Sequence, residues 1–412
     1  MKFLAFLRMT TTLAAYTLLT ATRRASSFTI RTHYRRSFNN IERPAFASKS
    51  NCILKMKDTS SSSSYWNREE SQRFQSMTTK ITKTAKIISL SNPDDDANRE
   101  LANLPDGAEI IAMGSSMSDF DIDALQKSGA NVIFAAHAKA KEPLAELLQN
   151  LPNIEWVHVR MAGLDFIHSP EFARSKVICT NAKGQFSSTL AEYTMMACSY
   201  FAKDLPRLMQ QKSAKVWGKY NVRELRGATM GIIGYGDIGR ACAKLAKAYG
   251  MKVLALRRNP SLADGDPYCD VVYGSSNEDV NKIMSESDYI LVAAPLTEAT
   301  RGLVGKEAFD HAKEGSVFIN VGRGPIVDED ALIEALKAKL RLRGAALDVF
   351  TVEPLPEDSE LWTLDNVLIS PHNMDQTATF LHEATEFFVH ENIPRFLRGM
   401  PLLNPVDKAA GY

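Results

Sequence analysis

The glycines at positions 234, 236 and 239 have the spacing of a loop that cradles phosphate groups. The stretch GIIGYGDIG (231–239) contains G-x-G-x-x-G, with an apolar run before it and RACAKLAKAYG after it. Gly234 allows a tight turn, Gly236 lets the backbone approach a pyrophosphate, and Gly239 lets a helix pack closely on the preceding strand. Any tight strand-to-helix turn can show such glycines, but a second apolar run, MKVLALR (251–257), follows the helix. The strand–helix–strand context predicts dinucleotide binding.

The end of the second apolar run is the position that distinguishes NAD from NADP. Proteins that prefer NAD usually carry Asp or Glu there, about 20 residues past the glycines, to accept a hydrogen bond from the ribose 2′-hydroxyl. This chain has Arg257 and Arg258 instead. Two guanidinium groups can bind a 2′-phosphate that a carboxylate would repel, although a solvated basic loop is the alternative interpretation. NADPH is therefore the predicted cofactor, with NADH possible.

Three polar side chains that could support reduction of a carbonyl group follow apolar segments later in the chain. Arg323 follows FINVG, Glu353 follows ALDVFTV, and His372 closes NVLISPH. His372 suits the general acid because histidine exchanges a proton near neutral pH, and Glu353 would favour its imidazolium form and fix its orientation. Arg323 would clamp a carboxylate or polarise the carbonyl. A strand-end arginine or a lone histidine is usually structural, but three such residues downstream of one nucleotide motif predict a hydride-transfer site.

The elements that must position these residues are short apolar runs alternating with helical segments from about residue 84 onward. This alternation predicts an α/β fold of two successive doubly wound parallel-sheet domains, with ligands at the carboxyl ends of the strands. A long helix is expected from residue 187 toward the glycine motif, and another over 375–399, which stops at Gly399. The predicted strands lie in segments 84–90, 108–114, 131–137, 154–160, 176–182, 228–234, 251–257, 289–295, 316–322, 344–350 and 366–372.

The charge of the chain is unevenly distributed. The 412 residues have a formal net charge of +1, but residues 1–57 hold eleven Lys and Arg residues and a single acid, Glu42. The rest of the chain has nine more acidic than basic residues, which argues against nucleic-acid binding. The five cysteines show no C-x-x-C spacing, and Cys198 and Cys242 lie in apolar helical stretches. We expect them to be buried, and we expect neither disulfides nor a metal site.

The N-terminal region has the composition of an organelle-targeting presequence, which we assign to residues 1–57. The motif Ala-Ser-Ser-Phe at 25–28 somewhat resembles the cleavage motif of two-part plastid presequences, so a plastid is expected and a mitochondrion is the alternative. The apolar stretch at 4–21 is too short and too polar for a membrane span, and none is expected in the mature form. The serine run at 60–64 predicts a disordered linker over 58–80.

Several longer segments carry a resemblance to a known family. They are AEYTMM (191–196), GYGDIGRACAKLAKAYGMKV (234–253), APLTEATRGLVG (294–305), NVGRGPIVDEDALIEAL (320–336), GAALDVFTVEP (344–354), SPH (370–372) and GMPLLNPV (399–406). Through these segments, of which the one at 320–336 is the strongest, the chain resembles the D-isomer-specific 2-hydroxyacid dehydrogenases, in particular glyoxylate/hydroxypyruvate reductases. The resemblance covers roughly residues 84–405.

The resemblance implies a domain organisation and a set of site residues. It implies a flavodoxin-like substrate-binding domain over 81–186, a Rossmann NAD(P)-binding domain over 187–372, and a C-terminal helix (373–412) that returns to the substrate domain. It also implies that Arg323, Glu353 and His372 are catalytic, and that loop 160–165 binds the substrate carboxylate, together with Arg323, through backbone N–H groups near Ala162 and Gly163. A homodimer is expected. The predicted cofactor site comprises Gly234, Tyr235, Gly236, Asp237, Ile238, Gly239, Arg257, Arg258, Pro295, Val321, Gly322 and Asp348.

Departures from the family pattern leave the substrate open. Arg257 replaces a common acidic residue and weakens an assignment to NAD. Asn373 and Asp375 follow the catalytic histidine where many members carry small residues, which would make that wall of the pocket bulkier and more polar. The sequence given ends shortly after GMPLLNPV, which argues against the phosphoglycerate dehydrogenases that carry a C-terminal regulatory domain.

The leading hypothesis is an NADPH-dependent reductase of a small 2-oxo acid, glyoxylate or hydroxypyruvate, that gives the D-2-hydroxy acid. An NAD-dependent 3-phosphoglycerate dehydrogenase of the short type is the alternative enzyme. An NAD(H)-sensing protein like the family's transcriptional corepressors is the alternative from another class, although the presequence argues against it. Formate dehydrogenase is disfavoured because its relatives carry Gln where Glu353 stands.

Overall fold

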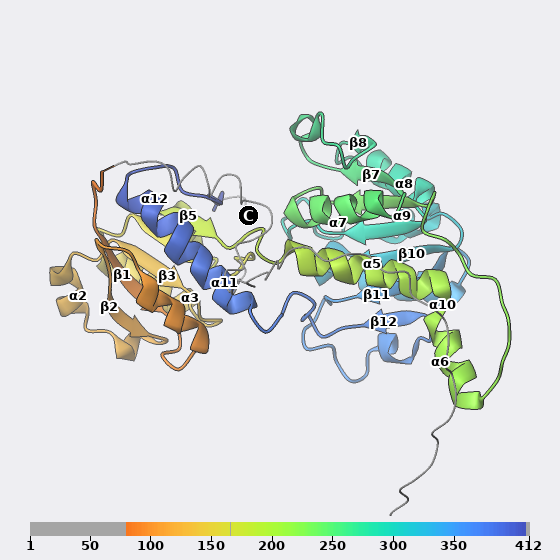
Figure 1. Ribbon diagram of the computed structural model, residues 1–412, viewed down its shortest axis with the longest axis horizontal. Helices are drawn as coiled ribbons and strands as arrows, with labels where there is room; N and C mark the ends of the chain where they lie inside the picture. Colours follow the sequence, from red (N-terminus) through yellow and green to blue (C-terminus); the bar gives the residue numbers. More distant parts are fainter. Residues whose placement is uncertain (1–79, 165, 409–412) are drawn as a thin grey trace, which may run out of the picture. The chain divides into compact units, whose positions relative to one another are not determined.

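Two parallel β-sheets organise residues 80–164 and 166–408, which are the residues that the computed structural model describes (Figure 1). The predicted presequence (1–57) and nearly all of the predicted linker (58–80) lie outside the described residues. The two sheets confirm the predicted pair of doubly wound α/β domains.

The first sheet has five strands in the order β2-β1-β3-β4-β5, which is the flavodoxin-like order. All neighbouring strands run parallel. Its strands are β1 (Ala85–Leu90), β2 (Ala108–Gly114), β3 (Val132–Ala135), β4 (Trp156–Val159) and β5 (Ile178–Asn181). The connections contain η1 (Asp96–Asn103), η2 (Met117–Asp119), α2 (Ile122–Ser128), α3 (Lys141–Asn150) and α4 (Pro170–Arg174).

The last helical segment of the chain packs against this first sheet. It consists of α11 (Phe380–Glu386), a π-helical turn (Phe387–Asn392) and α12 (Ile393–Leu397), and Figure 1 shows it lying along the sheet. Aromatic rings anchor it, because Phe388 stacks on Phe134 of β3 at a centroid distance of 4.6 Å. Gly399 follows with a φ of +66°. The helix begins at Phe380 rather than at the predicted residue 375, because residues 373–379 form turns, such as that closed by the Gln376 N–H and the Asn373 carbonyl.

The second sheet has seven parallel strands in the order β12-β11-β10-β9-β6-β7-β8. This is the Rossmann order with one added strand. The short strand β8 was not predicted, because a run of three apolar residues is too short to indicate a strand. The strands are β6 (Thr229–Ile233), β7 (Lys252–Leu256), β8 (Val271–Tyr273), β9 (Tyr289–Val292), β10 (Ser316–Asn320), β11 (Leu342–Leu347) and β12 (Val367–Ile369). The helices between them are α7 (Asp237–Ala248), η3 (Pro260–Ala263), α8 (Asn277–Glu286), α9 (Lys306–His311), η4 (Gly324–Ile326), α10 (Glu329–Ala338) and η5 (Glu360–Thr363).

Alternate residues of the central strands of this sheet face opposite apolar cores. Ile232 of β6 packs in the core on one face, and Ile233 packs in the core on the other. Phe318 and Ile319 of β10 divide in the same way. Burial on both faces explains why these strands are nearly continuous apolar runs in the sequence. Within residues 80–164 and 166–408, no helix is both long and apolar enough to cross a membrane.

The long helix predicted from residue 187 is wrong beyond residue 203. Helix α5 spans Ser187–Lys203 and a separate α6 spans Leu205–Ala214, with Asp204 between them at a φ of +53°. Pro206 has no N–H group to continue the helical hydrogen bonding to the Ala202 carbonyl. The Arg223 N–H donates to that carbonyl instead, at 2.9 Å, so the chain turns back toward β6.

Candidate active site

The glycine motif forms the turn between β6 and α7, and its three glycines have different surroundings. Gly234 has a φ of +102°, and a Cβ there would lie 2.5 Å from the Ala294 backbone nitrogen. A Cβ on Gly239 would lie 2.4 Å from the Gly234 carbonyl oxygen. A Cβ on Gly236 would meet nothing within 4 Å. Close packing therefore requires the first and third glycines, whereas Gly236 faces open space that a ligand can fill.

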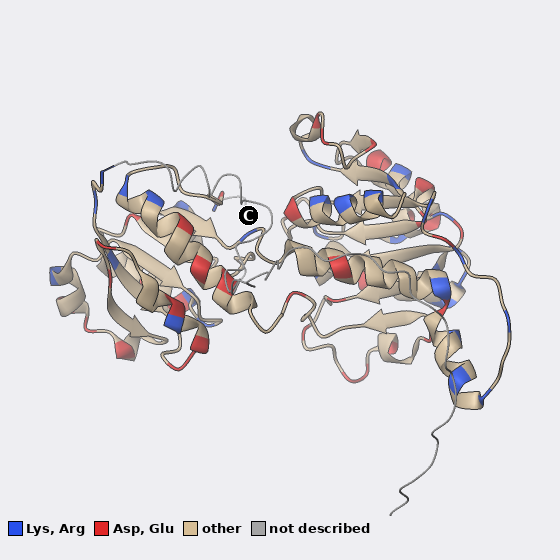
Figure 2. Ribbon diagram, viewed as in Figure 1, with Lys and Arg blue, Asp and Glu red and all other residues tan. Residues whose placement is uncertain are grey.

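Helix α7 begins directly behind this open space. Its N-cap is Gly236, which has no side chain to accept a hydrogen bond from the N–H groups of the first turn. Such N–H groups and the helix dipole bind phosphate, so the turn fits the pyrophosphate of a dinucleotide. Asp237 is the first helical residue, and Figure 2 shows basic residues along the rest of α7. Of the two other predicted contacts, Tyr235 is buried and Ile238 is half-buried.

Arg257 and Arg258 directly follow β7, the strand next to β6 in the sheet. Arg257 is half-buried as a residue, and its guanidinium donates to the Leu262 carbonyl at 3.2 Å in an exposed hydrogen bond. Arg258 is exposed. The strand therefore ends in two cations and no carboxylate, which fits a 2′-phosphate better than a free ribose hydroxyl pair.

The remaining predicted cofactor residues lie at the same carboxyl edge of the second sheet. Pro295 follows β9, and its carbonyl accepts a hydrogen bond from Thr300 at 2.7 Å. Val321 and Gly322 follow β10, where the Gly322 N–H donates to Asn320 at 3.0 Å. Asn320 was not predicted, although it holds this turn. Ligands bind at this edge in open α/β sheets.

His372 and Glu353 form a hydrogen-bonded pair at this edge. The distance between His372 Nδ1 and Glu353 Oε2 is 2.7 Å. The other carboxylate oxygen of Glu353 accepts from the Phe350 N–H at 2.9 Å, which fixes the carboxylate. The two side chains are 40% and 35% exposed, so solvent and a small ligand can reach them. Because Nδ1 is bonded to Glu353, Nε2 is the ring nitrogen left to exchange a proton with a ligand.

The backbone of His372 has a left-handed conformation, with a φ of +50°. Asp348 supports this segment: its Oδ1 accepts from the Ser370 hydroxyl at 2.7 Å and from the Asn373 N–H at 3.2 Å. Asp348 is 2% exposed, and burial raises the pKa of its carboxyl. The sequence placed Asp348 among the cofactor residues, and the structure gives it bonds on both sides of the histidine. Left-handed backbone at a non-glycine residue is uncommon and often marks a functional site.

Arg323 follows β10, three residues after the last residue of the strand. One of its guanidinium nitrogens donates to the Gly322 carbonyl at 2.9 Å. The next residue, Gly324, packs so tightly that a Cβ would lie 1.9 Å from the Phe350 carbonyl carbon. Sequence reasoning did not single out Gly324, but this close approach brings the ends of β10 and β11 together.

Asp375 lies close enough to both His372 and Arg323 for their charges to act on its carboxyl group. Burial nevertheless dominates and raises the pKa of Asp375, while the two neighbouring groups oppose the shift. Its Oδ1 atom is buried without a hydrogen-bond partner. Asp375 thus adds a carboxyl group to the surroundings of the His372–Glu353 pair.

The predicted substrate loop follows β4 at the carboxyl edge of the first sheet. The Asn181 side chain donates to the Ala162 carbonyl at 2.6 Å, which ties the loop to the end of β5. Arg160, the first residue of the loop, is buried and pairs with Asp95 at 2.5 Å. Gly163 is half-buried in the same turn, and residue 165 lies outside the described residues.

The described cysteines are in surroundings that keep them protonated. Cys198 and Cys242 are buried, as predicted, and burial raises the pKa of the Cys242 thiol to about 12. Among the residues that the structure describes, no group of three or more His, Cys, Asp or Glu side chains could hold a metal ion.

Comparison with known proteins places these features in one family. Residues 195–373 match the family model described as D-isomer specific 2-hydroxyacid dehydrogenase, NAD binding domain. The glyoxylate reductase of Thermococcus litoralis is 32% identical over 275 residues, which are 64% of this chain and 80% of that protein. The chain belongs to the D-isomer-specific 2-hydroxyacid dehydrogenase family. The second sheet is the NAD-binding domain of this family.

Two further members show how far the likeness extends. The crystal structure of a family member from Xanthobacter autotrophicus, in complex with NADPH and MES, is 28% identical with a TM-score of 0.67, and the match covers 80% of this chain and 100% of that one. The D-3-phosphoglycerate dehydrogenase of Methanocaldococcus jannaschii is 34% identical over 252 residues, which are 60% of this chain and 46% of that protein. The chain thus spans about half the length of the D-3-phosphoglycerate dehydrogenases it matches first.

Proposed function

We propose that this protein reduces a small 2-oxo acid to the D-2-hydroxy acid with NADPH as the hydride donor. The observation that carries the proposal is the 2.7 Å hydrogen bond between His372 and Glu353, on the same sheet edge as a glycine turn that fits a dinucleotide. When bound, the reduced nicotinamide supplies the hydride.

The residues of the chain have separate roles in this reduction. His372 donates a proton from Nε2 to the developing alkoxide, while Glu353 holds Nδ1–H and stabilises the imidazolium. Arg323 binds the substrate carboxylate and polarises the carbonyl. The backbone N–H groups around Ala162 and Gly163 complete the carboxylate site.

The preference for NADPH rests on Arg257 and Arg258. The Xanthobacter relative binds NADPH, which supports the same cofactor here. Replacement by Arg257→Asp with Arg258→Ala should raise the KM for NADPH about tenfold or more relative to that for NADH, because two charge-assisted phosphate contacts are lost at about 1.5–3 kcal/mol each. Initial rates with both cofactors measure this ratio. An unchanged ratio in the double variant would refute the assignment.

Glyoxylate or hydroxypyruvate is the proposed substrate, supported by the glyoxylate reductase among the relatives. Oxidation of 3-phosphoglycerate is the second candidate, because a D-3-phosphoglycerate dehydrogenase is also 34% identical. Initial rates with glyoxylate, hydroxypyruvate and 3-phosphohydroxypyruvate, each with NADPH and NADH, decide between them. A kcat/KM that is highest for 3-phosphohydroxypyruvate with NADH would favour the second candidate.

We also propose a homodimer and a plastid location for the protein. Large apolar side chains are exposed on and after α6, including Trp217 at 94% and Met209 at 67%, which supports a contact with a second copy. Light scattering should give twice the mass of one chain, and a monomeric mass would contradict the dimer.

The plastid location is tested by a fusion of residues 1–57 to a fluorescent protein. Fluorescence in the plastid would support the proposal, and fluorescence in the mitochondrion would favour the alternative organelle.

A further inference from the structure

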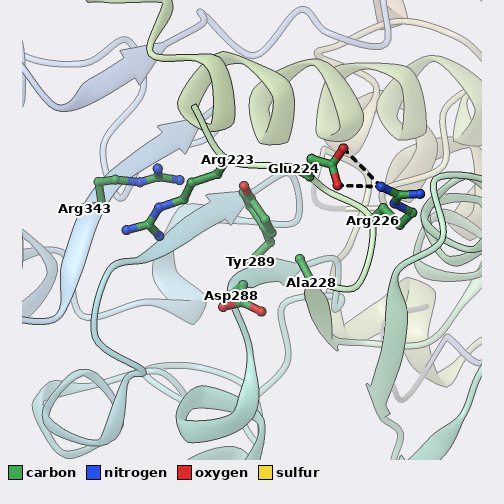
Figure 3. Close-up of a pocket in the computed structure, with 7 residues that line it drawn as sticks. All are labelled: Arg223, Glu224, Arg226, Ala228, Asp288, Tyr289 and Arg343. Atoms are coloured by element: carbon green, nitrogen blue, oxygen red, sulfur yellow. Dashed lines mark hydrogen bonds and ion pairs between the residues drawn. The ribbon is translucent and has the colours of Figure 1, made fainter. Parts of the chain in front are cut away.

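A cavity lies at the opposite edge of the second sheet from the glycine turn. It has a volume of about 390 Å³ and opens beside the first residues of β6, β9 and β11 (Figure 3). Its lining includes Arg223 and Arg343, with Tyr289 beside them. The volume is within the range of small-molecule sites, and the strands of the sheet separate it from the proposed catalytic residues.

Two guanidinium groups face this cavity side by side. Figure 3 shows Arg223 and Arg343 reaching toward one another next to the Tyr289 hydroxyl. Arg343 is half-buried, and its Nε atom is buried without a hydrogen-bond partner. Burial lowers the pKa of Arg343, and the like charge of Arg223 lowers it further by a smaller amount. Two cations held close together at a partly buried site repel each other, and an anion bound between them offsets this repulsion.

The carboxylates of the cavity lining are already used by other groups. Glu224 pairs with Arg226 at 3.0 Å. Asp288 pairs with Lys313 at 2.7 Å and accepts from the Thr229 N–H at 2.9 Å.

The two facing arginines have no such carboxylate. In the part of the chain that the structure describes, no ion pair joins Arg223 or Arg343 to an acidic side chain. Arg223 instead donates to the Gly315 carbonyl at 3.1 Å. The charge of Asp204 has a smaller effect on the pKa of Arg343 than the other neighbouring groups have. The Asp204 carboxylate instead caps the N-terminus of α6. The cavity therefore presents uncompensated positive charge.

We propose that Arg223, Arg343 and Tyr289 bind a dianionic phosphate group at this cavity, at a site separate from the cofactor and the substrate. Guanidinium groups bind phosphate oxygens through paired, charge-assisted hydrogen bonds. Burial raises the pKa of the Tyr289 hydroxyl, so it stays protonated and can donate a further hydrogen bond. The phosphate is either free or carried on a small metabolite that fills the rest of the cavity.

Isothermal titration of the full chain with inorganic phosphate tests the site. Saturating NADPH occupies the cofactor site, and constant ionic strength removes general salt effects. The wild type should bind phosphate, and Arg343→Met should weaken binding about tenfold or more. Arg341→Met is the matched control, because this exposed arginine, just before β11, donates to the Ala312 carbonyl at 3.4 Å and does not line the cavity. This control should bind phosphate as the wild type does.

Thermal unfolding without phosphate gives an independent readout. Arg343→Met should have a Tm equal to or above that of the wild type, because one of two repelling charges is gone, and phosphate should no longer raise it. Arg223→Gln, which changes an exposed side chain, should weaken phosphate binding in the same way and serves if Arg343→Met does not fold.

Three results would overturn the proposal: no phosphate binding by the wild type, binding by Arg343→Met within twofold of the wild type, or an equal loss in Arg341→Met. If the wild type does not bind phosphate and Arg343→Met is a monomer where the wild type is a dimer, the cavity residues form a contact between subunits instead of a phosphate site. Glycerol 3-phosphate identifies the source of the phosphate: tighter binding than inorganic phosphate indicates a phosphorylated metabolite, and equal or weaker binding indicates free phosphate.

Discussion

Substitution of Gly236 separates cofactor binding from folding, because this glycine alone of the three faces open space. We predict that Gly236→Ser weakens NADPH binding while the Tm stays near that of the wild type. Its φ of −97° and ψ of −153° suit any residue, the added Cβ meets no protein atom within 4 Å, and serine is a favoured N-cap residue. The new side chain instead occupies the space that the pyrophosphate requires.

The expected loss follows from the hydrogen bonds that the phosphate would make with the first turn of α7. A hydrogen bond to a charged group contributes about 1.5–3 kcal/mol, and about 1.4 kcal/mol changes Kd tenfold. Loss of one such bond should therefore raise the Kd for NADPH by about 10- to 100-fold. Titration of NADPH against protein fluorescence gives Kd, and thermal unfolding gives the Tm.

Gly239→Ala is the matched control within the same motif. Its Cβ would lie 2.4 Å from the Gly234 carbonyl oxygen, so the turn must shift, at a cost of about 1–3 kcal/mol. This variant should lose thermal stability even without cofactor. If Gly236→Ser bound NADPH within twofold of the wild type while folding normally, the assignment of this turn to the pyrophosphate would be wrong.

Three further predictions concern the catalytic edge. His372→Ala should lower kcat for reduction by about two to four orders of magnitude with an unchanged Kd for NADPH; comparable turnover would show a structural role. Glu353→Gln should move the pH above which reduction fails downward, because the carboxylate that stabilises the imidazolium is gone; pH–rate profiles measure this limit, and an upward move would contradict the pairing. Asp375→Asn should raise the Tm at neutral pH, because burial raises the pKa of Asp375 and keeping its carboxyl ionised in the folded protein then costs stability. Calorimetry should show this gain in Tm disappear below about pH 4, where the carboxyl is protonated in both the folded and the unfolded state. A gain in Tm that does not depend on pH would show that ionisation of Asp375 is not its cause.

The central strands of the second sheet were predictable because they are buried on both faces. Ile232 and Ile233 face different cores, so the strand is a continuous apolar run that the sequence shows directly. Strand β8 contributes only three apolar residues, which is too short a run to indicate a strand. The break at Asp204 was missed because an apolar helical pattern continues past it, although Pro206 was a local signal that the helix cannot continue.

The site was predictable in its residue types but not in how they are held. Arg323, Glu353 and His372 stand out because each is a polar residue that follows an apolar run in the sequence. The close approach of Gly324 to Phe350 and the buried Oδ1 of Asp375 depend on segments that meet only in the folded chain. No spacing in the sequence indicates these contacts.

Asp348 shows most clearly what the fold adds to the sequence. A carboxylate after a strand can equally contact a cofactor or hold the protein, and the sequence does not distinguish the two. In the structure its Oδ1 accepts hydrogen bonds from Ser370 and from the Asn373 N–H, which join the end of β11 to the segment around His372. Glu353, five residues later in the same loop, holds the imidazole ring itself. The loop after β11 thus fixes the histidine twice, its backbone through Asp348 and its ring through Glu353, which leaves Nε2 as the ring nitrogen able to deliver a proton.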